Sequence, residues 1–171
     1  MAGFTHDSVK NKTVDWWTPK WVFDELGLRF DLDPSAPLGG VPWIPVDRVY
    51  SIEDDGLLQP WSGRVWLNPP YGKHTAKWLA KMHAHRNGVA LVFARTDCRW
   101  FHDYLAKSDA LLFLKGRISF IDGLGVVGKK NSAGAGSVLA AWGDDCVEAL
   151  AAMARRGHGL FVRLWGQNDP V

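Results

Sequence analysis

The apolar run at residues 89–94 constrains the fold more than any other segment of the chain. It has the length of a β-strand, and Gly88 before it and the polar residues 95–97 after it mark its ends. Because no polar residue alternates with the apolar ones, both faces of this strand must be buried. The run is therefore typical of a parallel sheet that helices cover on both sides.

Further short apolar segments alternate with helical ones along the chain. We expect strands at 29–33, 48–52, 64–68, 110–114 and 118–121, helices at 18–26, 73–86, 97–106 and 145–155, and closing segments at 137–142 and 160–165. Thr18 and Pro19 suit the start of the first helix as cap and first-turn residue. The glycine-rich stretch 122–136 predicts a mobile surface loop. Together these segments predict a single α/β domain with a mostly parallel central sheet and helices on both faces.

Length and composition set further bounds. A chain of 171 residues has the length of one domain, which we expect at 15–171 after a polar arm at 1–14. Cys98 and Cys146 show no disulfide or zinc spacing, and the histidines show no metal spacing, so we expect a reduced, cytoplasmic protein without a metal. No apolar run approaches the ~20 residues of a membrane span. The net charge of +2 permits a polyanionic partner without establishing one.

The content of ten tryptophans is high for this length. Trp16, Trp17, Trp43 and Trp61 have polar or proline neighbours, so we do not expect all of them in the core. Exposed indole rings at the edge of a groove would suit stacking on nucleobases. About half of the tryptophans are equally well explained as large core residues.

Polar residues follow three of the predicted strands, at Asp33-Pro34-Ser35, Asn68-Pro69-Pro70-Tyr71 and residues 95–97. In an open α/β sheet the ligand binds beyond the carboxyl ends of the strands, so we expect these residues to meet in one crevice. The absence of a G-x-G-x-x-G or Walker loop argues against a dinucleotide dehydrogenase or a P-loop enzyme.

The tetrapeptide Asn68-Pro69-Pro70-Tyr71 fits a planar amine. Such an amine has two N–H donors, which the side-chain oxygen of Asn68 and the main-chain carbonyl of Pro69 could accept while Tyr71 stacks on the plane. Bonds of this kind would direct the nitrogen lone pair toward an electrophile. A rigid strand-to-helix turn with a packed tyrosine is the alternative interpretation.

The order of motifs resembles a known family. The segments T-P-K-W-V-F-D-E-L, F-D-L-D-P-S-A, D-D-G-L-L-Q-P-W, V-W-L-N-P-P-Y-G, R-T-D-C-R-W-F-H and G-R-I-S-F are similar to those of the small Dam-like DNA adenine-N6 methyltransferases typical of phages and prophages. The resemblance covers roughly residues 15–142. It implies a Rossmann-like methyltransferase fold, S-adenosylmethionine as cofactor and DNA as substrate, acting as a monomer or homodimer in the cytoplasm of a bacterial or phage-infected cell. Protection from restriction and regulation are both compatible with it.

The resemblance also implies roles for single residues. Asn68, Pro69, Pro70 and Tyr71 would bind the target amine and its ring. The cofactor would contact Asn68 and a set that comprises Thr18, Pro19, Asp33, Pro34, Ser35, Asp54 and Asp55. Substrate contacts are expected from Trp100, Phe101, Arg117, Lys129 and Lys130.

Several of these residues also have a purely structural interpretation. Asp33 could be a turn carboxylate, residues 54–56 an ordinary turn, Trp100 and Phe101 core residues, and Lys129 and Lys130 a solvated loop tip. The family's glycine-rich turn after the first-strand acid is replaced here by residues 35–40, in which the glycines come several residues late. Two other functions also fit the sequence: amino-methylation of RNA or of a protein glutamine, and non-catalytic nucleic-acid binding.

Overall fold

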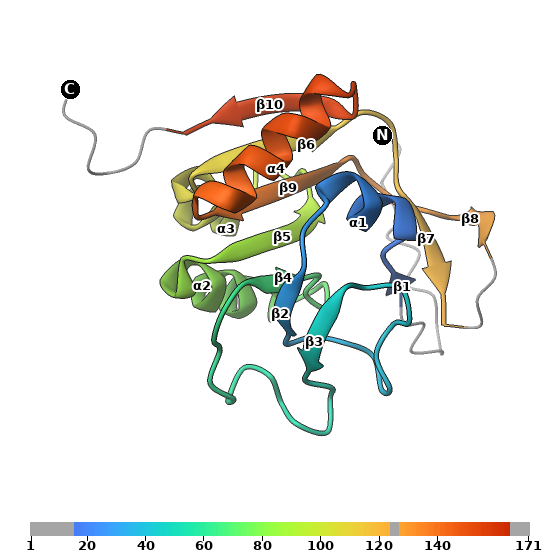
Figure 1. The fold of residues 1–171 in the computed structure, drawn as a ribbon, viewed down its shortest axis with the longest axis vertical. Coiled ribbons are helices and arrows are strands. Elements are labelled where there is room, and N and C mark those ends of the chain that lie inside the picture. Colours follow the sequence, from blue (N-terminus) through green and yellow to red (C-terminus); the bar gives the residue numbers. More distant parts are fainter. Residues whose placement is uncertain (1–15, 124–126, 165–171) are drawn as a thin grey trace, which may run out of the picture.

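The computed structural model describes residues 16–123 and 127–164 (Figure 1). Most of the strands form a seven-stranded sheet in the order β10-β6-β9-β5-β4-β2-β3. Its strands are β2 (Phe30–Asp33), β3 (Val46–Val49), β4 (Val65–Leu67), β5 (Gly88–Phe93), β6 (Ala110–Leu114), β9 (Ser137–Trp142) and β10 (Gly159–Arg163). The pairs β2–β3, β2–β4 and β4–β5 are parallel, whereas β5–β9, β6–β9 and β6–β10 are antiparallel.

Helices cover both faces of this sheet, as predicted. The helices α1 (Lys20–Leu26) and α4 (Asp144–Arg155) pack on one face, in front of the sheet in Figure 1. The other face carries α2 (Thr75–His85), α3 (Arg99–Asp103) and the 3-10 helix η1 (Leu105–Lys107). Along β5, Leu91 packs on the face that α1 and α4 cover, whereas Ala90 and Val92 pack on the face that α2 and α3 cover. This alternation is the period of a strand that is buried on both sides.

The expectation of a mostly parallel, Rossmann-like sheet is not confirmed, because half of the pairings are antiparallel. The reason lies in the connection between β6 and β9. Parallel neighbours need a long crossover, usually a helix, that carries the chain back to the starting edge of the sheet. Here β6 is followed instead by two antiparallel strands, and β9 enters between β5 and β6 in the reverse direction.

These two strands, β7 (Ser119–Asp122) and β8 (Val127–Ser132), form a second sheet with β1 (Trp16–Trp17) in the order β1-β7-β8. The expectation of a mobile loop over 122–136 is therefore wrong for its central part, which is a strand paired with β7. The sequence Val-Gly-Lys-Lys-Asn-Ser has no apolar alternation, so its pairing with β7 could not be foreseen.

The remaining segments match their predictions with shifted ends. β3 begins and ends earlier than expected, and the helix expected at 97–106 is divided into α3 and η1. The residue that precedes α1 as its N-cap is Pro19, and no side-chain cap is found there, so Thr18 has a different role. The polar arm at 1–14 lies outside the described residues. None of the helices in the described part of the chain is long and apolar enough to cross a membrane.

Candidate active site

A cavity of about 1020 Å³ lies at the carboxyl ends of β2, β4 and β5. We call it the central cavity. Its volume is at the upper end of the ~300–1000 Å³ found for small-ligand sites, so two ligands could meet in it. The residues that line it and matter below are Trp16, Trp17, Thr18, Asp33, Ser35, Asp55, Asn68, Pro69, Tyr71, Phe93 and Phe120. The predicted meeting of Asp33 and its neighbours with the Asn68 motif therefore occurs, and residues 95–97 do not take part.

The side-chain amide of Asn68 is held by its nitrogen. Asn68 Nδ2 donates to the carbonyl of Trp16 at 3.3 Å and to Oγ1 of Thr18 at 3.4 Å. Asn68 Oδ1 is buried and has no hydrogen-bond partner among the described residues. A buried acceptor without a partner is costly, about 1 to 3 kcal/mol, unless a ligand donates to it. Asn68 lines the central cavity, so its amide keeps an acceptor without a described partner next to that cavity.

The main-chain carbonyls of the motif also include both bonded acceptors and an acceptor without a partner among the described residues. Ser35 Oγ donates to the carbonyl of Asn68 at 3.0 Å, and Thr75 Oγ1 donates to the carbonyl of Pro70 at 3.1 Å. No hydrogen bond reaches the carbonyl of Pro69 within the described part of the chain. Two acceptors at the end of β4, Oδ1 of Asn68 and the carbonyl of Pro69, thus have no partner in the described part of the chain.

Tyr71 stacks on Phe93, with ring centroids 4.1 Å apart and planes inclined by 17°. Phe93 ends β5, so the adjacent strand supports the tyrosine from one side. The Tyr71 side chain remains 42% exposed. A ring that is supported on one side and open on the other can stack on a planar ligand.

Asp33 is a buried carboxyl group without a cationic partner among the described residues. Only 4% of it is exposed, and its Oδ1 accepts a hydrogen bond from the amide of Ser35 at 3.1 Å. Burial raises the pKa of Asp33 to about 7, and the hydrogen bonds from Ser35 offset only part of this effect. A bound cation would remove the penalty, so Asp33 fits a ligand with a positively charged group.

The loop after β3 brings Asp55 to the cavity. A Cβ atom on Gly56 would lie 1.9 Å from the carbonyl oxygen of Pro34, so only glycine lets the loop approach the turn after β2 this closely. Asp55 lines the central cavity. Asp54 does not, because its carboxylate accepts hydrogen bonds from the amide and hydroxyl of Ser51 within the loop. Of the two predicted neighbours, Asp55 is the one placed to contact a ligand.

Lys81 holds this loop from α2. Its Nζ donates to the carbonyls of Leu57 at 2.7 Å, Gln59 at 2.5 Å and Gly56 at 3.3 Å. It also lies 5.0 Å from the centre of the Trp61 ring, a cation–π arrangement. No sequence motif indicated this residue, because its three partners are main-chain atoms in another segment.

Replacing Lys81 by methionine should leave these carbonyls without a charged donor and loosen the loop that carries Asp55. We expect the free energy of unfolding to fall by roughly 2 kcal/mol, as for hydrogen bonds to charged groups. Urea denaturation measures this change, with Lys77→Gln on the same helix as the control. Equal stability of Lys81→Met and wild-type protein would contradict the assigned role.

Several predicted site residues do not line the central cavity. Phe101 is buried in the core, Trp100 packs against the same cluster, and Pro19 caps α1. Arg117 is exposed on the segment between β6 and β7. Lys129 and Lys130 belong to β8, and their side chains lie outside the described ones. Their roles toward a substrate stay predictions.

Other residues enter the site from places that motif reasoning did not assign. Trp16 and Trp17 line the cavity from β1, and Phe120 lines it from β7. For the two tryptophans, the polar residues next to them in the sequence indicated a position outside the core. Trp43 instead supports the site from behind, because its Nε1 donates to the carbonyl of Thr18 at 2.9 Å.

Comparison with known proteins adds one match. The model of the Dam family, described as DNA N-6-adenine-methyltransferase, matches residues 5–153. Neither the curated proteins nor the solved structures contain a match. The matched range includes every residue of the central cavity discussed above.

Proposed function

The chain belongs to the Dam family of DNA N-6-adenine-methyltransferases, and on this basis we propose that it methylates N6 of adenine in DNA with S-adenosylmethionine as methyl donor. In this proposal residues 15–171 act as one catalytic domain in the cytoplasm of a bacterial or phage-infected cell. The central cavity holds both the cofactor and an adenine rotated out of the duplex.

The observation that carries the proposal is the pair of free acceptors at the end of β4. An adenine N6 amine has two N–H donors, and Oδ1 of Asn68 and the carbonyl of Pro69 are two acceptors to which no described residue donates. The bonds from Asn68 Nδ2 fix the amide so that it offers its oxygen. Accepting both N–H bonds directs the nitrogen lone pair toward the methyl donor.

The open face of Tyr71 would receive the adenine ring. Rotating a base out of the duplex costs a few kcal/mol. Stacking on an aromatic side chain contributes ~1 to 3 kcal/mol and would offset part of this cost. Because Phe93 supports the tyrosine from behind, little side-chain entropy is lost when the base stacks.

The residues opposite the motif fit S-adenosylmethionine. When bound, this cofactor supplies an activated methyl group on a sulfonium centre. Asp33 would bind its α-ammonium group, which is the cation that this buried carboxyl lacks. Thr18, 1% exposed in the wall of the cavity, would face the methionine carboxylate, and Asp55 would accept from the adenine amine of the cofactor.

Methyl transfer then depends mainly on position. Asn68 and Pro69 would hold the attacking nitrogen toward the methyl group, and the two oxygens that accept hydrogen bonds from its N–H groups would stabilise the positive charge that develops on the nitrogen. No base needs to remove a proton before attack. The new nitrogen–carbon bond would replace the carbon–sulfur bond of the cofactor, S-adenosylhomocysteine would be the leaving group, and the methylated nitrogen would then release one proton to water.

The pKa of Asp33 leads to a test of cofactor binding. Above pH 7 the carboxyl is ionised and attracts the ammonium group, whereas below pH 7 it is protonated. We therefore expect the Kd for S-adenosylmethionine to increase about tenfold per pH unit below 7 and to be constant from pH 7.5 to 8.5 or so. Isothermal titration calorimetry from pH 5.5 to 8.5 measures this. A Kd independent of pH would contradict the assignment of Asp33 to the cofactor.

A further inference from the structure

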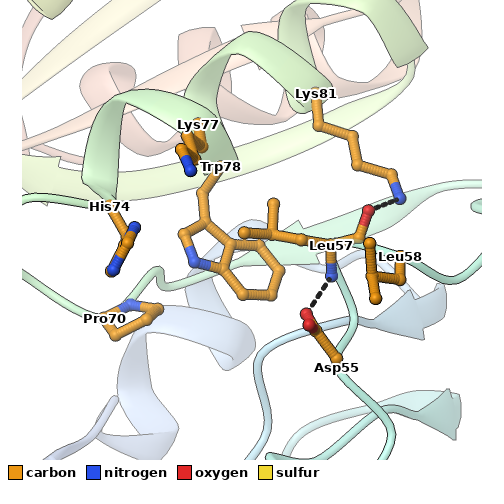
Figure 2. A pocket seen from close by; sticks show the side chains of 8 residues that line it. All are labelled: Asp55, Leu57, Leu58, Pro70, His74, Lys77, Trp78 and Lys81. Carbon is orange, nitrogen blue, oxygen red and sulfur yellow. Dashed lines mark hydrogen bonds between the residues drawn. The ribbon is translucent and has the colours of Figure 1, made fainter.

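A second cavity of about 570 Å³, which we call the side cavity, lies between α2 and the loop at 55–58 (Figure 2). One wall consists of His74, Lys77, Trp78 and Lys81, whose spacing of three and four residues places them on one face of the helix. The other wall consists of loop residues from Asp55 to Leu58. Lys81 fixes the width of the cavity because it bonds this loop to the helix.

The lining combines apolar surface with the ammonium group of Lys77, the imidazole of His74 and the carboxylate of Asp55. Trp78, Pro70 and Leu58 are apolar, and Leu58 is 81% exposed. Lys77 and His74 are exposed, and neither forms an ion pair with a described carboxylate, whereas Lys20, Arg86 and Arg99 elsewhere on the surface do. A fitting ligand has a flat, weakly polar part and an anionic part, as a nucleotide does.

The side cavity lies beside the central cavity. Asp55, Pro70 and Trp78 line both of them. A ligand that extends from one cavity into the other must therefore be longer than a single nucleoside. A DNA strand is such a ligand, because a phosphate links each of its nucleotides to the next one.

We infer that the side cavity binds the nucleotide next to the target adenine, with Lys77 and His74 on its phosphate and the apolar wall against its base or sugar. The inference rests on the proposed function, since the target adenine must occupy the central cavity. It places the path of the DNA strand along α2, where no sequence motif had indicated a contact.

Replacing Lys77 by glutamine tests the inference, because this exposed side chain forms no ion pair with a described carboxylate, so its loss should not affect folding. Binding of a short labelled duplex DNA is measured by fluorescence anisotropy at several salt concentrations. We expect three- to tenfold weaker binding and a slope of log K against log salt that is smaller by about one. Lys77→Arg should restore both, and the Kd for S-adenosylmethionine should not change.

Lys107→Gln is the matched control, because it removes one exposed charge from η1, outside both cavities. It should bind DNA with the wild-type slope. If Lys77→Gln behaves like Lys107→Gln while the wild type methylates DNA, the inference fails and the proposed function stands. If the wild type neither binds nor methylates DNA, the proposed function fails and the inference fails with it.

Discussion

Replacing Asn68 by alanine is expected to lower the rate of methyl transfer by at least 10²- to 10³-fold, the effect of removing one hydrogen-bonding group that stabilises developing charge. The substitution removes Oδ1, one of the two acceptors at the end of β4 that have no hydrogen-bond partner among the described residues. The cofactor contacts at Asp33 and Asp55 are left in place. We therefore expect the Kd for S-adenosylmethionine to stay within about threefold of wild type while kcat falls.

Single-turnover kinetics with excess enzyme measure this separation of chemistry from binding. Asn87→Ala is the matched control, since Asn87 is an exposed asparagine beyond the end of α2 and outside the cavity. It should react at the wild-type rate. An Asn68→Ala variant with more than a tenth of the wild-type kcat would show that Oδ1 of Asn68 does not hold the amine.

Replacing Asp33 by asparagine should stabilise the protein without ligand while it weakens cofactor binding. The ordinary pKa of an aspartate is near 4, and that of Asp33 in the folded protein is about 7. Between these values the unfolded chain loses a proton that the folded protein keeps, so the free energy of unfolding falls as pH rises from 4 to 7. Above pH 7 the loss is complete and amounts to at most about 4 kcal/mol.

Asparagine keeps an oxygen that can accept from Ser35 and carries no charge, so this pH dependence should disappear. At pH 8 we expect a gain of roughly 2 to 4 kcal/mol and a Tm higher by roughly 10 °C. The Kd for S-adenosylmethionine should increase about 10²- to 10³-fold, because the ammonium group is left without its partner.

Thermal denaturation at pH 5 and pH 8 measures the first effect, and calorimetry measures the second. Asp31→Asn, an exposed position on the same strand, is the control for both. A variant at position 33 that is no more stable than wild type at pH 8, and that binds the cofactor equally well, would contradict the role of Asp33.

The meeting of Asp33 with the Asn68 motif in one cavity was predicted correctly, because it depends on residues at the ends of strands. Asp33 is the last residue of β2, and Asn68 to Tyr71 directly follow β4; local sequence determines where both strands end. Since neighbouring parallel strands place their carboxyl ends at one edge, the meeting of these residues follows from strand order alone.

Other parts of the site depend on contacts between distant segments, and sequence patterns do not record them. The side chain of Phe93 supports Tyr71, and Lys81 bonds three carbonyls of a loop more than twenty residues away. β9 is antiparallel to β5 because the chain between β6 and β9 forms the strands β7 and β8 and not a crossover helix. No apolar alternation in the sequence predicted that β8 is a strand. Trp100 and Phe101 had the spacing of a helix face, and that face packs into the core.

Product analysis tests the central claim most directly. The purified protein is incubated with S-adenosylmethionine, carrying an isotopically labelled methyl group, and with unmethylated DNA or RNA in separate reactions. The nucleic acids are then digested to nucleosides and analysed by mass spectrometry. We expect labelled N6-methyladenine from DNA with the wild type and none with Asn68→Ala. Label on another atom, on RNA alone, or in equal amount with the Asn68→Ala variant would contradict the account.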